Sequence, residues 1–432
     1  MVSDERTAGQ VRRRNLADEA SRSLFVLPAL IVVASTALGE VLAEVDDRID
    51  PGELPGFLET TQDSARAMLG AIAGGTITAA AVVLSFTLVA VQLASSQYSP
   101  RTLGRFLGDR FQQVVMGIVF GTFTYCIVVL RELEDVGPRA VQPGPQVATS
   151  GAVIFAIAAL LAVLASIDHT ARSLQVESIA ERVSQAAVAI AREEYPLLDG
   201  PAAPPDPLPE IPANALVVPA HRTGWVQQFP LRAAVECLPP GTTAIRHVVA
   251  GGHVAEGDPL ATVWPVPERP AEVIRALQDT CDLGSTRTMQ DDVGFGITQL
   301  VDIAARALSP AVNDPYTAQE IIQRQTPLLR ELMTRDLTLH PVTDGDRAVH
   351  PEPGWDADAF LDLAVGSLRW HAREQPWVLI TLVEQLRDLR DVAVDREPVE
   401  RQARDLLGEL HRLAPTDVER VRAAARTCGW DA

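Results

Sequence analysis

The segment AMLGAIAGGTITAAAVVLSFTLVAVQLA, residues 67–94, decides the architecture of this chain. It contains no charged residue and no histidine, and it is longer than the roughly 20 apolar residues that a bilayer-spanning helix needs. Three further apolar segments flank it, at residues 24–45, 114–130 and 148–167. The sequence therefore predicts four transmembrane helices within residues 24–167.

Charged residues between these segments predict how the helices are oriented. Arginines precede the first span and separate the second from the third, whereas the other two loops are rich in Asp and Glu. The arginines are Arg6, Arg12, Arg13, Arg14, Arg22, Arg101, Arg105 and Arg110. Cytoplasmic loops carry the excess of Lys and Arg, so both termini are expected in the cytoplasm.

Composition excludes several classes of function. The formal net charge of −19 argues against nucleic acid as a partner, because no basic face can neutralise many phosphates. The chain contains no lysine, which excludes a Walker A phosphate loop and a Schiff-base cofactor. None of the four cysteines forms a CxxC pair, so we expect reduced, mostly buried thiols and no zinc site. No cofactor is predicted.

The second span carries one polar stripe on an otherwise apolar helix. Thr78, Ser85 and Gln92 recur every seven residues, and Ser96 falls on the same helical face. Polar groups at membrane depth face protein or water and not lipid. Two interpretations stay open. The stripe packs against another helix together with nearby glycines, or it lines a pore built from several copies of the chain.

Charge is absent from the middle of every predicted span. Proton relays, voltage sensors and ion-coupled transporters usually carry intramembrane ionisable residues. The sequence therefore leaves two kinds of role for the membrane region, which are a weakly selective pore and an anchor without conduction.

The remainder of the chain reads as a mixed α+β domain. Residues 168–195 predict a juxtamembrane helix, and PLLDGPAAPPDPLPEIP, residues 196–212, predicts a Pro-rich linker. Short apolar runs punctuated by Gly and Pro in residues 213–266 predict a small β domain, part of which resembles half of a barrel sandwich. Amphipathic periodicity in residues 267–432 predicts a helical part that packs around a core.

The densest group of polar side chains follows residue 290. Asp291, Asp292, Asp302, Asn313 and Asp314 lie within one predicted helix–turn–helix. Oxygen ligands of this kind suit Mg²⁺ or Ca²⁺, so the group is a candidate ligand or metal site. The competing interpretation is structural, since acids stabilise helix N-termini and Asp302 can pair with Arg306. Catalysis by this group is the third alternative, and no catalytic residue is predicted elsewhere.

Three long motifs resemble a known family. They are VVLSFTLVAVQLASSQYSPR (82–101), GTFTYCIVVL (121–130) and DDVGFGITQLVDIAARALSPAVNDPYTA (291–318). Together they resemble a bacterial family of predicted membrane proteins, the domain of unknown function numbered 2254. The resemblance implies that residues 291–318 are a family signature and that the bacterial cytoplasmic (inner) membrane is the location. It implies no activity, cofactor or catalytic residue.

The expected fold is therefore membrane α-helical, with four transmembrane helices, followed by a cytoplasmic α+β domain with a small β barrel-like part and a helical C-terminal part. The expected segments are 1–23 (cytoplasmic N-terminal), 24–167 (transmembrane), 168–195 (juxtamembrane helix), 196–212 (linker), 213–266 (β domain) and 267–432 (helical domain).

The leading functional hypothesis is a homo-oligomeric channel-like or transport assembly with a cytoplasmic regulatory domain, and not an enzyme. The alternative is a membrane-anchored ligand- or protein-binding sensor or scaffold without conduction. The expected partners are the lipid bilayer, further copies of the chain, and a divalent cation or small ligand on the cytoplasmic domain.

Overall fold

A computed structural model describes residues 25–46, 48, 61–97, 109–133, 145–173, 175–198, 200 and 206–431. The side chains of residues 93–97 and the predicted N-terminal segment 1–23 lie outside the described residues, as does part of the linker. The chain divides into two compact units, Met1–Gln175 and Val176–Ala432. We call them the N-terminal unit and the C-terminal unit.

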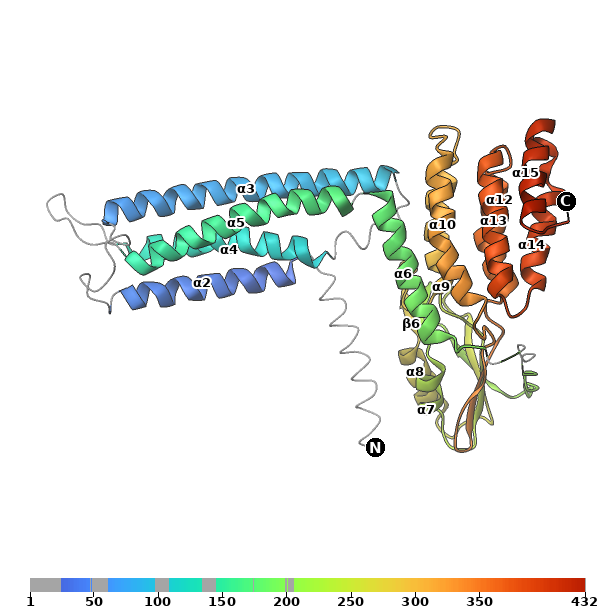
Figure 1. Cartoon of the computed structure of the whole chain (residues 1–432). Coiled ribbons are helices and arrows are strands. Elements are labelled where there is room, and N and C mark those ends of the chain that lie inside the picture. The colour runs from blue at the N-terminus through green and yellow to red at the C-terminus, as the bar shows by residue number, and fades with distance from the viewer. Residues whose placement is uncertain are drawn as a thin grey trace. The chain divides into compact units, whose positions relative to one another are not determined.

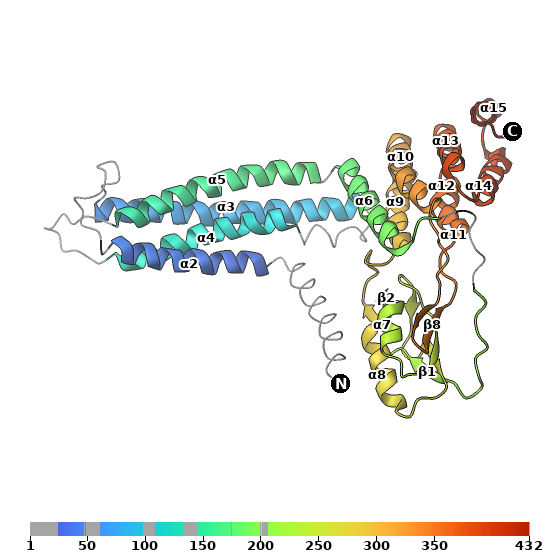
Figure 2. The same ribbon diagram turned by 60° about the horizontal axis from the view of Figure 1, so that its bottom comes forward.

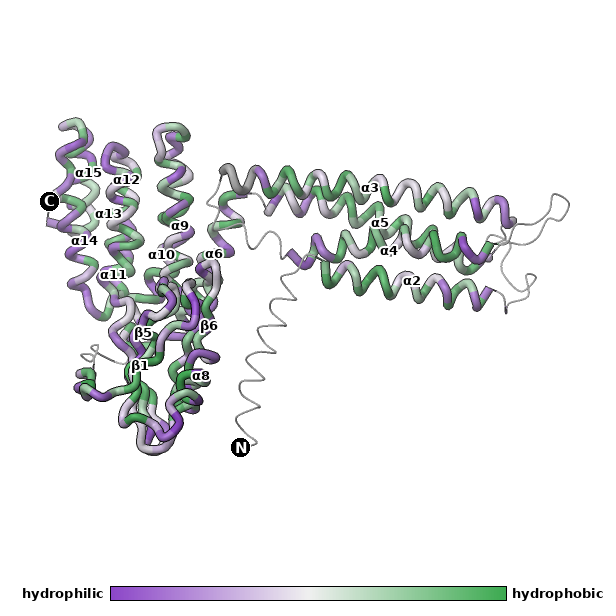
Figure 3. The backbone as a smooth tube through the Cα atoms, turned by 180° about the vertical axis from the view of Figure 1, so that it is seen from behind, coloured by the Kyte–Doolittle hydropathy of each residue, from purple (hydrophilic) through white to green (hydrophobic). Residues whose placement is uncertain are grey.

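The N-terminal unit is a bundle of four long helices (Figure 1). They are α2 (Val26–Asp46), α3 (Gln62–Gln97), α4 (Arg110–Glu132) and α5 (Gln146–Ser173). Each is long and apolar enough to cross a membrane. Their apolar residues form nearly continuous tracts in Figure 3, as the four-span prediction requires. The prediction of four apolar spans is thus confirmed.

Small residues bring the helices of this bundle close together. A Cβ at Gly117 would lie 2.5 Å from the Ile31 side chain, and one at Gly121 would lie 2.5 Å from Ser35 Oγ. Tyr125 is fully buried and donates a hydrogen bond of 2.8 Å to the Ala148 carbonyl on α5. Close backbone approach and inward-facing polar groups are typical of helix packing in membranes.

Polar contacts tie the bundle together near both of its ends. At one end Arg66 donates to the Leu133 carbonyl at 3.3 Å. Toward the other end the Gln112 side chain accepts from Ser166 and donates to Thr87, each at 2.8 Å. About 31 Å of helix separates Arg66 from Thr87 at 1.5 Å per residue, which matches the thickness of a hydrocarbon core.

The C-terminal unit begins with α6 (Val176–Glu194), which lies beside other long helices in Figures 1 and 2. These are α9 (Val293–Ala307) and α10 (Pro315–Leu332), and α13 (Pro376–Val392) packs on α10. Further α-helices are α7 (Leu231–Glu236), α8 (Pro270–Thr280), α11 (Ala357–Leu361), α12 (Ser367–His371), α14 (Glu397–Gly408) and α15 (Pro415–Thr427). The predicted juxtamembrane helix is therefore divided between α5 and α6. A π-helical turn, η3 (Asp362–Gly366), joins α11 to α12, and a 3-10 turn, η4 (Leu410–Arg412), follows α14.

The strands form two open sheets. One has the order β1-β5-β3-β8-β7 and the other β4-β2-β6. The strands are β1 (Leu216–Pro219), β2 (Gly224–Gln228), β3 (Thr243–Arg246), β4 (His253–Val254), β5 (Pro259–Trp264), β6 (Asp282–Gly284), β7 (Val342–Asp344) and β8 (Arg347–Pro351). Neither sheet closes on itself, so the barrel-like part of the prediction is not confirmed.

Long-range pairing explains why some strands lie outside residues 213–266, the predicted β domain. β3 pairs in parallel with β8, with Ala244 opposite Val349, although α8, α9 and α10 lie between them in sequence. A parallel pair needs a long crossover connection, which local strand patterns do not reveal. Helices α7 and α8 lie beside this sheet in Figure 2, and their apolar residues join its core.

Candidate functional site

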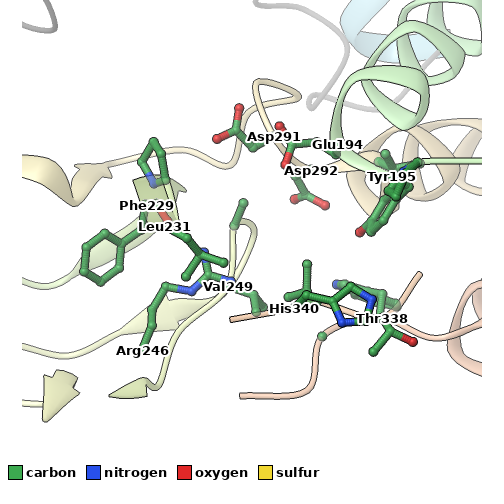
Figure 4. A pocket seen from close by; sticks show the side chains of 18 of the residues that line it. Glu194, Tyr195, Phe229, Leu231, Arg246, Val249, Asp291, Asp292, Thr338 and His340 are labelled. Carbon is green, nitrogen blue, oxygen red and sulfur yellow. The ribbon is translucent and has the colours of Figure 1, made fainter. Parts of the chain in front are cut away.

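A cavity of about 380 Å³ lies within the C-terminal unit, between the end of α6, the start of α9 and two loops (Figure 4). Glu194 and Tyr195 come from the end of α6, and Asp291 precedes α9. Arg246 comes from the end of β3, and Trp355 from the loop after β8. The volume falls within the range typical of small-molecule sites, about 300–1,000 Å³.

Arg246 places a cation in the wall of this cavity. The residue is only 8% exposed, because the alternation of β3 turns it toward the same side as buried Ala244. One terminal nitrogen donates to the Phe229 carbonyl at 2.7 Å, while the buried Nε has no hydrogen-bond partner. Burial lowers the pKa of the guanidinium to about 10, and the nearby carboxylates of Glu194 and Asp291 oppose that effect. The group is therefore cationic at neutral pH.

Two carboxylates face the cavity without neutralising Arg246 directly. Among the described residues, no ion pair within 4.0 Å joins Arg246 to Glu194 or Asp291. Asp291 accepts a hydrogen bond of 2.8 Å from Gln228. Partial burial, helped by Asp291 and Glu193, raises the pKa of the Glu194 carboxyl to about 7. Burial also raises the pKa of Asp291.

A third carboxylate, Asp292, is held firmly by the protein. Its oxygens accept from Arg287 at 2.5 and 3.0 Å, and one of them also caps α9 by accepting from Phe295 N at 2.9 Å. The turn at Gly251, with φ of 83°, presses against this pair, since a Cβ there would lie 2.1 Å from Asp292 Oδ2. Asp292 is thus satisfied internally.

Aromatic rings close another side of the cavity. Trp355 stacks on Phe360 with ring centroids 5.4 Å apart. Tyr195 meets the same Phe360 edge-on at 6.3 Å. Such pairs supply rigid apolar surface for a ligand. In Figure 4 the carboxylates of Glu194, Asp291 and Asp292 gather together on one side of the cavity, and Arg246 approaches from another.

The charges in the cavity match a small molecule that carries both an acidic and a basic group. A ligand carboxylate would occupy the unfilled hydrogen-bonding position at Arg246. A ligand ammonium would sit near Glu194 and Asp291. A buried charge costs free energy unless it is paired, so Arg246, which is buried, gains from such a ligand. Among the residues that the structure describes, no three His, Cys, Asp or Glu side chains gather as a metal-binding group.

The structure separates the five predicted ligand or metal candidates. Asp291 and Asp292 line the cavity. Asp302 lies on α9, about 15 Å along the helix from Asp292 at 1.5 Å per residue. Asn313 and Asp314 lie at the turn into α10, where Asp314 caps the helix by accepting from Thr317 N at 3.1 Å. The structural interpretation therefore explains Asp314, and the ligand role of the others stays a prediction.

The predicted pore-lining residues lie on the outward face of α3. Thr78, Ser85 and Gln92 are all exposed in the single chain, whereas the opposite face buries Leu69 and Ala80. Thr78 donates to the Gly74 carbonyl of its own helix at 2.8 Å. The side chain of Ser96 lies outside the described residues. The part of the bundle that the structure describes leaves Thr78, Ser85 and Gln92 exposed.

Sequence reasoning missed most of the cavity. The sequence predicts that Glu194 lies in the juxtamembrane helix and Arg246 in the small β domain, and neither prediction indicates a cavity. The sequence TAIRHVV does contain a signal, because period two puts Arg246 on the inward face with Ala244. A charged residue at an inward strand position marks a buried polar site. Trp355 had no comparable signal, since it lies in a loop.

One family model matches most of this chain. Residues 21–388 match the family described as "Predicted membrane protein (DUF2254)". Relatives include "Uncharacterized protein Mb1321c" of Mycobacterium bovis and "Uncharacterized protein Rv1290c" of Mycobacterium tuberculosis. Each is 29% identical to this chain over 403 residues, covering 89% of this chain and 75% of the relative. No solved structure matches the chain.

Proposed function

Because the chain belongs to the DUF2254 family of predicted membrane proteins, we propose that it is a membrane-anchored sensor. In this proposal the four apolar helices hold the protein in the bilayer, and the C-terminal unit binds a small zwitterionic molecule. The free amino acids are the ligand class that we favour. The distribution of arginines in the sequence supports a bacterial inner membrane location with both termini in the cytoplasm.

One observation carries the proposal, namely the separated charges of the cavity. Arg246 offers an unused buried donor, while Glu194 and Asp291 offer acceptors that no ion pair with Arg246 satisfies. Clustered groups with shifted pKa values in a concave site are typical of binding or catalytic sites. The apolar walls near Trp355 would contact the side chain of the ligand.

Helix α6 connects this cavity to the fourth span along the chain. Its last residue, Glu194, lines the cavity, and its first residue, Val176, follows the last residue of α5, Ser173, by three positions. The helix has 19 residues, or about 28 Å at 1.5 Å per residue. A ligand that draws in Glu194 and Tyr195 would therefore shift a rigid element that leads back to the fourth span.

Thermal unfolding of the full-length protein in detergent tests the binding step. We expect free amino acids to raise the melting temperature, because a ligand at 100 times its dissociation constant adds about 2.7 kcal/mol of stability. The same skeletons lacking either the amino or the carboxyl group should have little effect. Glu194→Gln and Asp291→Asn should weaken the response, whereas Glu177→Gln, exposed in the first turn of α6 and outside the cavity, is the control. A response to the deaminated acids equal to that of the amino acids would contradict the proposal.

A second candidate function is a homo-oligomeric channel-like assembly that the C-terminal unit regulates. The outward position of Thr78, Ser85 and Gln92 favours it, because polar side chains on a lipid-facing surface gain from a neighbouring copy. Four spans per chain suit a pore built around an axis between copies. The same face would also suit simple packing between helices of two copies.

Ion flux through liposomes containing the purified protein tests this second candidate. We expect measurable flux from the natural sequence and a clear reduction in Ser85→Leu, since a leucine would replace a polar group on the axis with an apolar one. Phe86→Leu, at an exposed apolar position next to Ser85, is the control. Absence of flux for every ion tried with the natural sequence would remove the channel hypothesis.

A further inference from the structure

The C-terminal unit carries a second surface, at the end of its helices opposite the cavity. We propose that this end, built by the turns α9–α10 and α12–α13, docks onto the lipid headgroups of the bilayer. Its exposed apolar side chains are Val312 (55% exposed), Tyr316 (81%), Trp370 (60%) and Trp377 (56%), which we call the aromatic end. The inference is independent of the ligand and channel proposals.

Hydrogen bonds show that the two turns form one surface. Gln375, between α12 and α13, donates to the Asn313 side chain in the α9–α10 turn at 3.0 Å. Gln319 on α10 donates to the Trp377 carbonyl at 3.1 Å. Tyr316 and Trp377 each lie in the first turn of their helix. Tyr316 and Trp377 therefore lie in the first turns of two neighbouring helices.

The register between α6 and α10 fixes where this surface lies relative to the start of the unit. Ser184 donates to the Arg324 carbonyl at 2.7 Å, and Arg192 pairs with Glu331 at 2.8 Å. The residue numbers of the contacting pairs rise in the same direction along α6 and α10, so the two helices run parallel. Counting back nine residues from Ser184 and from Arg324 gives Gln175 and Pro315. Tyr316 therefore lies level with the first residue of α6.

Chain connectivity limits how far the start of α6 can lie from the fourth span. The apolar part of the fourth span ends near Ile167, and α5 continues to Ser173. The remaining helix and the link to Val176 reach at most about 20 Å, at 1.5 Å per helical residue and 3.8 Å per extended step. The start of α6 is therefore tethered within that distance of the end of the apolar span, which leaves the aromatic end free to reach the headgroups.

The chemistry of the surface suits a membrane interface. Trp and Tyr are enriched at the headgroup level, where an apolar ring and a polar group are both satisfied. Arg373 lies over the Trp370 ring at 4.2 Å, and Arg420 over Trp377 at 5.8 Å. The Arg420 side chain is 58% exposed and pairs with Asp417 at 2.8 Å, so its guanidinium lies where a headgroup phosphate can reach it. All exposed aromatic side chains that the structure describes in the C-terminal unit, namely Tyr316, Trp370 and Trp377, lie at this end.

Tryptophan fluorescence offers a direct test, because all six tryptophans of the chain lie in the C-terminal unit. They are Trp225, Trp264, Trp355, Trp370, Trp377 and Trp430. The full-length protein is placed in nanodiscs of plain phospholipid or of phospholipid brominated high on the acyl chain. We expect bromine to quench part of the emission, and the double variant Trp370→Phe/Trp377→Phe to lose the quenchable part. Trp225→Phe is the reporter control and should keep it.

A second variant tests the lipid contact of the aromatic end without removing a tryptophan. Tyr316→Asp keeps all six tryptophans and should weaken the quenching, since a carboxylate disfavours the interface. Val394→Asp changes an exposed apolar residue just after the far end of α13 and should leave quenching unchanged. Equal emission in plain and brominated discs would overturn the proposal and would point to a protein partner on this surface. Quenching that persists in the double Phe variant would also overturn it.

Discussion

Asp292 makes two interactions that different substitutions can separate. Its side chain is 1% exposed, pairs with Arg287 and caps α9. Asp292→Ala should destabilise the C-terminal unit by about 3–5 kcal/mol, because it leaves Arg287 unpaired in a buried setting. Asp292→Asn retains a good capping residue and loses only the charge, so it should cost less.

Chemical denaturation of the two variants measures this difference. Asp314→Asn is the matched control, because Asp314 caps α10 without an Arg partner among the described contacts. A loss of stability in Asp292→Ala no larger than in Asp314→Asn would show that the pair with Arg287 contributes little.

The raised pKa of Glu194 predicts that the free energy of unfolding depends on pH. Its folded pKa of about 7 lies above the ordinary value of 4.5, so the folded protein binds the proton more tightly than the unfolded chain. This contribution is fully present below pH 4.5 and is lost as the pH rises through about 7. Glu194→Gln should therefore be more stable than the natural protein at pH 8, by about 1 kcal/mol after solvent screening, and the difference should shrink toward pH 5.

Thermal unfolding across pH 5–8 checks this prediction, with Glu177→Gln, an exposed position in the first turn of α6, as the control. A difference between Glu194→Gln and the natural protein that grows as the pH falls would contradict the sign of the shift. At the residue scale the sequence alone was informative about Asp291 and Asp292 and silent about Glu194, since desolvation depends on tertiary neighbours.

At the scale of elements, the polar residues of the α3 stripe lie at different levels along the helix. Arg66 and Thr87 mark two levels along α3 that are about 31 Å apart, close to the thickness of a hydrocarbon core. Thr78 and Ser85 fall between these marks, whereas Gln92 lies about 7 Å beyond Thr87. In the flux assay, Ser85→Leu should therefore reduce conduction more than Gln92→Leu. The opposite order would place the narrow part of the pathway beyond the bundle.

The elements differ in how far sequence predicts them. Four apolar spans and most of the amphipathic helices follow from local periodicity, and their caps at Asp292 and Asp314 follow from residue type. The pairing of β3 with β8 does not, because β8 lies about 100 residues further along the chain and no local pattern encodes a parallel partner. The cavity depends on that pairing, since Trp355 follows β8 directly.

At the scale of the whole molecule, α6 connects both surfaces of the C-terminal unit. Its first turn lies level with the aromatic end, and its last residue, Glu194, lines the cavity. α9 runs in the opposite direction, from Asp292 at the cavity to the turn that carries Val312. A ligand signal and a membrane contact would thus act on opposite ends of the same rigid helices.

Calorimetric titration of the full-length protein with free amino acids at pH 7 tests the central claim most directly. The account predicts saturable binding of one ligand per chain. It also predicts proton release that varies with the ionisation enthalpy of the buffer, because a ligand ammonium lowers the pKa of Glu194 from about 7. Glu194→Gln should bind more weakly and release no proton from this site. Folded protein that gives no saturable heat with any free amino acid would contradict the account.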